Sequence, residues 1–334
     1  MRETLQDKCS LYADNYLKLK DSFKWGYPMN NRLGALLYTM ENLPADVAGI
    51  KNCREIIKAN SSIFSQFQSF TSFMLAVTLS LKSDPENKIR DSLTIYESLK
   101  RAGFHSSPYL VLAAASIAIY AEPGEYQDCV IRAKAFFDAM KAEHRFLTTA
   151  DDYSFAALLA LSGKEVSPTI LEIEDCYHLL KEDFRNSNAV QSLAQVLSFQ
   201  EEKAQVKCDR VVELYQELKR RGLKFGLYFE LPFLGVLTML PKEVSEIADE
   251  VAEAEGYLKE IKGFGNWSIT AKERLMFVAA LVCDSFLADE AKEHLEGSMS
   301  NNTTVVLLAQ QAMTTAITSA IAAAAAASAA ASST

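Results

Sequence analysis

The sequence predicts an all-α protein, an α-solenoid of about seven two-helix repeats of roughly 40 residues each. Three observations predict this fold. A helix-ending motif recurs at regular intervals, charged helical segments alternate with nearly all-apolar ones, and no segment sustains the alternation of apolar and polar residues that is typical of strands. We expect the repeats to occupy residues 1–297 and an uncharged, Ala-rich helix or tail to occupy residues 298–334.

The recurring motif is a bulky apolar residue followed by lysine at the end of a charged amphipathic stretch. Its seven copies are Leu19-Lys20, Ile57-Lys58, Leu99-Lys100, Met140-Lys141, Leu180-Lys181, Leu218-Lys219 and Leu258-Lys259. The successive lysines lie 38, 42, 41, 40, 38 and 40 residues apart, which is too regular for unrelated helix ends. In five copies an aromatic residue stands three positions before the apolar one, so both side chains share one helix face. These aromatic residues are Tyr16, Tyr96, Phe137, Tyr177 and Tyr215.

A short break follows each charged helix and contains Gly, His or a polar cluster, as at Gly26, Gly103, Gly222 and Gly263. Glycine just past a helix end adopts the left-handed conformation that the C-cap requires. The helices that follow often open with Ser, Thr or Pro, for example at residues 106–108, which fits N-cap and first-turn preferences.

The second helix of each predicted pair is apolar almost all round, as in residues 109–118 and 275–282. A helix without a polar face must be surrounded by protein or lipid. Because none of these runs is a clean span of about 20 apolar residues, protein is the expected surrounding. We therefore expect buried inner helices paired with amphipathic outer ones, with each pair contacting mainly its neighbours.

Composition narrows the class of partner. The net charge of −9 disfavours a nucleic-acid partner, because such proteins present basic surfaces to phosphates. The six cysteines are far apart and form no CxxC pair or Cys/His cluster, so neither a metal nor another cofactor is predicted. They are expected to be buried thiols in a reducing compartment. The charged residues 1–8 are followed by no apolar run, which indicates no secretory signal and a cytoplasmic location.

Two strings carry a resemblance to a known family. YESLKRAGF at residues 96–104 and HRFLTTADDY at residues 144–153 resemble a bacterial family known only as domain of unknown function number four thousand and three. The segment 303–313 and the Ala-rich tail are similar to the way its members end, so the resemblance covers nearly the whole chain. Thr149 stands where the family often has Gly, which affects only the local turn. Since the family has no assigned activity, the resemblance implies a helical fold and a cytoplasmic bacterial origin, and nothing about chemistry.

One cluster suggests chemistry. His144, Asp151, Asp152 and Tyr153 lie close together in sequence, and one imidazole with two carboxylates could bind a divalent metal or act as acid and base. The structural interpretation is stronger. His144 falls at the end of an outer helix, where it can cap carbonyls, and the aspartates fall in the first turn of the next helix, where negative charge is favoured.

Trp267 is a second candidate for ligand binding. The segment from Gly263 to Trp267 lacks the third glycine and the preceding strand of a phosphate loop. We expect Trp267 to pack against the protein rather than to serve as a platform for a ligand.

Charged residues gather in two further places. Acidic residues concentrate between Glu243 and Glu255, and basic residues concentrate between Lys219 and Lys224. Pairing on solvated helix faces explains most of both groups, and the alternative is a surface that binds a peptide.

No nucleophile, base or phosphate loop recurs at a catalytic spacing, so we expect a non-enzymatic scaffold that binds a protein or peptide. One alternative is an enzyme, metal-dependent or acid/base, centred on His144, Asp151 and Asp152. Another is peripheral membrane association through the tail. Polar residues such as Gln310 and Gln311 oppose insertion of that tail, which favours a helix that caps the repeats or pairs with another chain.

Overall fold

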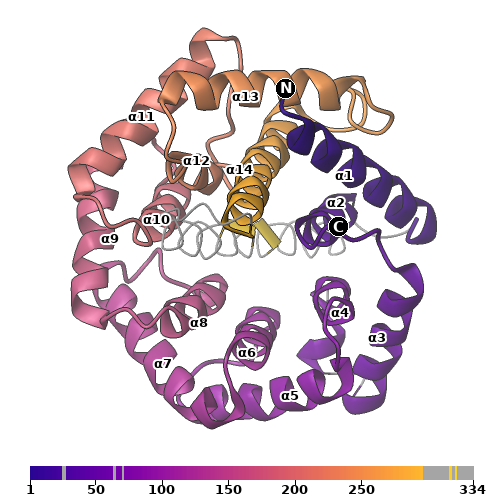
Figure 1. The fold of residues 1–334 in the computed structure, drawn as a ribbon. Coiled ribbons are helices and arrows are strands. Elements are labelled where there is room, and N and C mark those ends of the chain that lie inside the picture. The colour runs from indigo at the N-terminus through magenta and orange to yellow at the C-terminus, as the bar shows by residue number, and fades with distance from the viewer. Residues whose placement is uncertain (25–27, 63–64, 70, 296–315, 318–319, 322–334) are drawn as a thin grey trace. The chain divides into compact units, whose positions relative to one another are not determined.

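The computed structural model describes residues 1–24, 28–62, 65–69, 71–295, 316–317 and 320–321 (Figure 1). Within these residues the protein has fourteen α-helices, three short 3₁₀ helices and no strand, so the all-α prediction is confirmed. The odd-numbered helices are α1 (Glu3–Ser22), α3 (Val47–Asn60), α5 (Pro85–Arg101), α7 (Tyr126–Glu143), α9 (Val166–Leu180), α11 (Ala204–Arg220) and α13 (Val244–Glu260). The even-numbered helices are α2 (Pro28–Met40), α4 (Ser72–Ser80), α6 (Pro108–Tyr120), α8 (Tyr153–Leu161), α10 (Ser187–Leu197), α12 (Pro232–Thr238) and α14 (Ala271–Leu295). The 3₁₀ helices are η1 (Gln66–Gln68), η2 (Pro123–Glu125) and η3 (Ala150–Asp152).

The apolar–lysine motif marks the ends of the odd-numbered helices, as predicted. Its lysine lies in the last turn in six of them and directly follows α9 in the seventh. Every apolar member of the motif is buried. Each copy therefore anchors one helix end in the core and places a cation beside the helix's unpaired carbonyl groups.

The breaks between helices also follow the expected chemistry. Gly103, Gly222 and Gly263 have φ values of 99°, 80° and 94°, in the left-handed region that favours glycine. Ser107 accepts a hydrogen bond from the Leu110 amide at 3.1 Å and so caps α6, whose first residue is Pro108. Gly26 lies outside the described residues.

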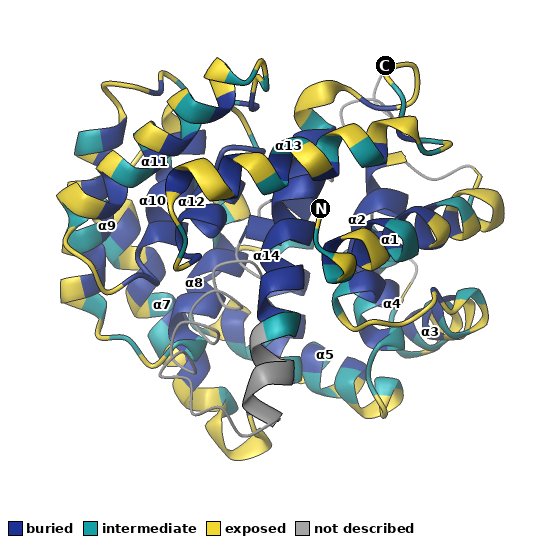
Figure 2. Cartoon of the chain, turned by 45° about the horizontal axis from the view of Figure 1, so that its top comes forward, coloured by how far each residue is buried: buried dark blue, intermediate teal, exposed yellow. Residues whose placement is uncertain are grey.

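The chain divides into two compact units. One consists of Met1–Leu17, Tyr38–Pro44 and Glu172–Ala316, and the other of Lys18–Leu37, Ala45–Leu171 and Ile317–Thr334. In both, the even-numbered helices carry most of the buried residues and the odd-numbered helices alternate buried and exposed positions (Figure 2).

In the unit that holds α3 to α8, each odd-numbered helix packs on the even-numbered helix that follows it. The helices α3, α5 and α7 form one row, and α6 packs directly on α8 (Figure 1). Phe104, Phe137 and Tyr153 meet here with ring centroids 4.9 to 5.4 Å apart.

In the other unit α12 packs on α10 and α14, and α13 packs on α11 and α14. Residues 1–17, which include the first part of α1, also belong to this unit. The Tyr12 ring lies 5.2 Å from Phe264 and 5.4 Å from Phe277. We predicted that each helix pair contacts mainly the pairs next to it in sequence. This packing departs from that prediction, because Tyr12 of α1 contacts aromatic residues about 250 positions later in the chain.

Candidate functional site

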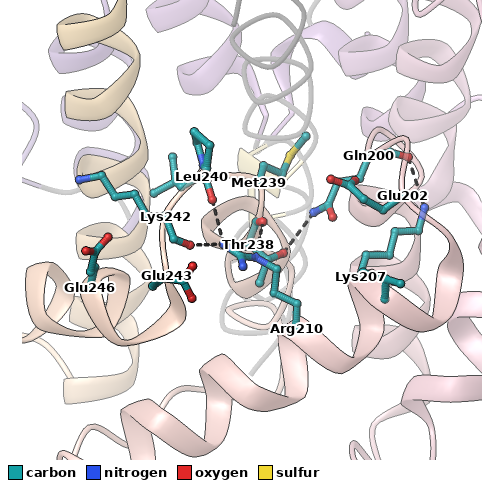
Figure 3. Close-up of a pocket in the computed structure, with 12 residues that line it drawn as sticks. Gln200, Glu202, Lys207, Arg210, Thr238, Met239, Leu240, Lys242, Glu243 and Glu246 are labelled. Carbon is teal, nitrogen blue, oxygen red and sulfur yellow. Dashed lines mark hydrogen bonds between the residues drawn. The ribbon is translucent and has the colours of Figure 1, made fainter.

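A cavity of about 480 Å³ opens where α10 ends, α11 begins and the chain passes from α12 to α13 (Figure 3). All of its lining residues belong to the unit that contains α10 to α14. They are Gln200, Glu202, Val206, Lys207, Arg210, Thr238, Met239, Leu240, Pro241, Lys242, Glu243 and Glu246.

Lys207 and Arg210 stand three residues apart on α11 and therefore project from one helix face. The Lys207 side chain is buried, donates to the carbonyl oxygens of Leu197 at 2.9 Å and Gln200 at 3.4 Å, and forms an ion pair with Glu172. Leu197 is the last residue of α10, and its carbonyl also accepts a hydrogen bond from the Gln200 amide at 3.0 Å, so Lys207 adds a cationic donor to the carbonyl groups at this helix end.

Arg210 does the same for α12. Its Nε donates to the Thr238 carbonyl at 3.0 Å, and its Nη2 donates to the Leu240 carbonyl at 2.9 Å and to the Lys242 carbonyl. The guanidinium thus holds the whole turn from α12 into α13 in one conformation, and that turn forms one wall of the cavity.

Gln200 joins α10 to α12 beneath the cavity. Its Nε2 donates to the Gly235 carbonyl at 3.2 Å and to the Thr238 hydroxyl at 3.1 Å, and that hydroxyl donates to the same carbonyl at 2.9 Å. Gly235 allows α12 to pack closely against α10, because a Cβ at this position would lie only 2.8 Å from Leu193 Cδ1. The floor of the cavity is therefore a fixed hydrogen-bonded frame.

The third cation of the cavity, Lys242, forms an ion pair with Glu250. Glu250 also accepts hydrogen bonds from Arg2 Nε at 3.0 Å and Nη2 at 2.8 Å. Burial opposes ionisation of Glu250, but the hydrogen bonds and charges of Arg2 and Lys242 outweigh it and lower the pKa of this carboxyl group.

The rim of the cavity carries the opposite charge. Glu202, Glu243 and Glu246 are exposed, and none of them forms an ion pair with another described residue. Val206, which is 55% exposed, adds an apolar surface beside them. Because the cations of the cavity are already engaged by carbonyls and by Glu172 and Glu250, the open groups favour a cationic ligand with an apolar stem.

The cluster predicted from sequence lies at helix ends in the other unit. His144 is the C-cap of α7, and its backbone amide donates to the Met140 carbonyl at 2.9 Å. Asp152 accepts a hydrogen bond from the Thr149 amide at 2.9 Å within a capping box, and Asp151 accepts one from the Thr149 hydroxyl. These positions agree with the helix-end interpretation.

Tyr153, the fourth member of that cluster, is buried. Its hydroxyl accepts a hydrogen bond from the His105 amide at 3.3 Å, and its ring packs on Phe104 and Phe137. Among the described His, Cys, Asp and Glu residues, no group of three is arranged to hold a metal ion. None of the four clustered residues lines the cavity.

Trp267 is fully exposed, so the expectation that it packs against the protein is wrong. Phe264, three residues earlier, takes the buried position, with its ring 5.2 Å from Tyr12 and 5.1 Å from Tyr16. The Ser268 amide donates to the Gly265 carbonyl at 2.8 Å in the turn that carries the indole. Trp267 does not line the cavity either.

The frame residues of the cavity were not predicted, although a sequence pattern contains them. Four odd-numbered helices carry one or two cations nine or twelve positions before the lysine of their motif, and each cation donates to a carbonyl at or near the end of an even-numbered helix. These pairs are Lys8 with Thr39, Lys88 with Ala118, Arg132 with Ala160, Lys207 with Leu197 and Arg210 with Thr238. The register of the cation within the repeat could have identified them.

No helix within the described part of the chain is both long and apolar enough to cross a bilayer. The predicted tail, residues 298–334, lies outside the described residues except at 316–317 and 320–321, which are helical and buried.

Comparison with known proteins gives a family but no activity. The model of the family described as "Protein of unknown function (DUF4003)" matches residues 15–312. The chain is 24% identical over 264 residues to "Uncharacterized protein YeaA" of Bacillus subtilis (strain 168). The aligned region covers 76% of this chain and 80% of that protein. No solved structure matches the chain significantly.

Proposed function

The chain belongs to the DUF4003 family of proteins of unknown function, and for this member we propose a non-enzymatic role in binding a protein or peptide segment. The observation that carries the proposal is the cavity beside α11, with its rigid frame and its acidic rim. Its volume of about 480 Å³ is in the range of pockets that enclose a ligand group, roughly 300 to 1,000 Å³.

The rim selects the chemistry of the bound segment. Glu202, Glu243 and Glu246 attract a cation, and Val206 supports the methylene stem of a lysine or arginine side chain. The net charge of −9 adds a long-range attraction for a basic partner. The bound segment is therefore a basic peptide or a basic loop of another protein.

The architecture suits such a role. We interpret the recurring helix pairs as the repeats of an α-solenoid, a class of fold that commonly binds extended segments. The regular spacing of the motif and the packing of successive pairs within each unit support this interpretation. A cytoplasmic location is part of the proposal, and the six free, buried cysteines support it because such thiols persist in a reducing compartment.

Fluorescence anisotropy with labelled Arg-rich and Glu-rich peptides tests the proposal on the full chain. We expect the Arg-rich peptide to bind and the Glu-rich peptide not to bind. The triple variant Glu202→Gln, Glu243→Gln, Glu246→Gln should weaken binding at least about tenfold, and added salt should weaken binding to the unmodified protein.

Glu260→Gln is the matched control, because Glu260 is an exposed carboxylate at the other end of α13 and does not line the cavity. It should leave the affinity unchanged. Equal binding of the two peptides, or equal affinity of the triple variant and the control, would count against the site.

A further inference from the structure

Two buried cysteines face each other across neighbouring helices. Cys176 on α9 and Cys208 on α11 have exposed fractions of 0% and 2%, and the Cys208 thiol donates to the Cys176 carbonyl oxygen at 3.8 Å. The Lys207–Glu172 ion pair joins the same two helices. Because Lys207 precedes Cys208 directly and Glu172 lies one turn before Cys176, the ion pair holds the two thiols at close range.

The two thiols differ in acidity. The contact with the Cys208 side chain lowers the pKa of Cys176 against the opposing effect of burial, and the positive charge of Lys207 lowers it further. The same contact and burial raise the pKa of Cys208. Burial also raises the pKa of the other four cysteines, Cys9, Cys53, Cys129 and Cys283. Cys176 is thus the thiol best suited to react as a thiolate, and Cys208 is a protonated partner beside it.

We propose that Cys176 and Cys208 are a redox-active pair that forms a reversible disulfide between α9 and α11 when the protein meets a peroxide. The Cys176 thiolate attacks the O–O bond of hydrogen peroxide, an S–O bond forms, and the hydroxide that leaves takes up a proton. The Cys208 sulfur then attacks the Cys176 sulfenic acid, the S–O bond breaks, and the departing hydroxide leaves as water with the Cys208 proton. The two thiols lose two electrons and two protons, and the peroxide is reduced to two waters.

Burial sets the rate of this step. Since neither sulfur is open to solvent, peroxide reaches Cys176 only when the contact between α9 and α11 opens locally. Oxidation is therefore slower than that of an exposed thiol. Once formed, the disulfide is shielded and requires a strong dithiol reductant.

Peptide mapping of the full-length protein tests the pair directly. After treatment of the folded protein with hydrogen peroxide, alkylation and trypsin digestion, we expect residues 165–181 joined to residues 208–210 by a disulfide. Dithiothreitol should release both peptides, and two of the six free thiols should be lost in the oxidised protein.

Cys176→Ser and Cys208→Ser should each abolish the linked peptide, whereas Cys129→Ser, at a buried cysteine on α7, should leave it. Circular dichroism shows whether each variant is folded. The peptide mapping of the unmodified protein tests the proposal even if a variant does not fold. If peroxide oxidises other cysteines first, or if the linked peptide forms only in urea, the proposal is wrong.

Discussion

Lys8 and Asp284 form a buried ion pair in which burial changes the pKa of the carboxyl group. Lys8 is 4% exposed, forms an ion pair with Asp284 and donates to the Thr39 carbonyl at 3.2 Å. Burial raises the pKa of Asp284 from 3.8 to about 6, Lys8 opposes this change and Glu41 adds to it. Desolvation therefore costs the carboxylate more than its partner returns, as is common for buried ion pairs.

This raised pKa predicts a pH-dependent stability. The folded protein binds a proton at Asp284 below about pH 6, whereas the unfolded chain binds it only below about pH 3.8. The contribution of Asp284 is thus full below pH 3.8 and is lost as the pH rises through 6. We expect the free energy of unfolding of the unmodified protein, relative to Asp284→Asn, to fall by about 2–3 kcal/mol over this window.

Urea denaturation of both proteins at a series of pH values measures that difference. The variant carries a neutral amide at this position at every pH, so residue 284 contributes no pH dependence to its stability within the window. A difference that stays constant, or that grows with pH, would contradict the assignment. Asp289→Asn, which removes another carboxylate from α14, is the control and should not reproduce this fall.

At the scale of helices, the sequence predicted where helices begin and end, because these positions are set by residues close together in the sequence. The apolar–lysine motif, the glycine breaks and the N-cap at Ser107 are decided by residues within one or two turns of each other. The helix ends at His144 and Asp152 were predicted for the same reason. The exposure of Trp267 was not predicted, because it depends on a contact between distant residues: Phe264 occupies the buried position beside Tyr12 and Tyr16.

Two glycines, one within α13 and one in the break after it, allow a matched test of these rules. Gly263 has φ of 94°, and a Cβ there would lie 2.9 Å from the Tyr16 ring. A Cβ at Gly256, inside α13, would meet no side chain within 4 Å. We expect Gly263→Ala to lower the free energy of unfolding by about 1–3 kcal/mol and Gly256→Ala to raise it by up to about 1 kcal/mol.

Thermal and urea denaturation of the two variants provide the measurement. Equal effects of the two substitutions would show that neither the left-handed conformation nor the contact with Tyr16 matters. The sign of the Gly256 result separates helix propensity from packing, because only propensity acts at a position where the new methyl group meets no side chain.

At the scale of the chain, sequence reasoning failed where distant segments meet. The cavity combines residues from the end of α10, the start of α11 and the turn before α13, and no periodicity within one helix shows which of these side chains converge. The packing of residues 1–17 with Phe264 and Phe277 is another such case. Apolar periodicity identifies the buried face of a helix but not the partner that covers it.

The contact between Tyr12 of α1 and Phe277 of α14 predicts that these two helices unfold together. Tyr12 is fully buried between Phe264 and Phe277, so Tyr12→Ala removes an aromatic core residue and should lower the free energy of unfolding by about 3–5 kcal/mol. Tyr228→Ala, at a side chain that is 61% exposed, is the control and should change stability by less than about 0.5 kcal/mol.

Hydrogen exchange followed by mass spectrometry resolves where the loss occurs, because local opening reports the stability of each segment. In Tyr12→Ala the amides of α1, α13 and α14 should lose protection together, while those of α5 to α8 in the other unit keep theirs. Loss confined to α1 would show that the helix is only an attached arm, and equal loss in both units would show that the chain unfolds as one.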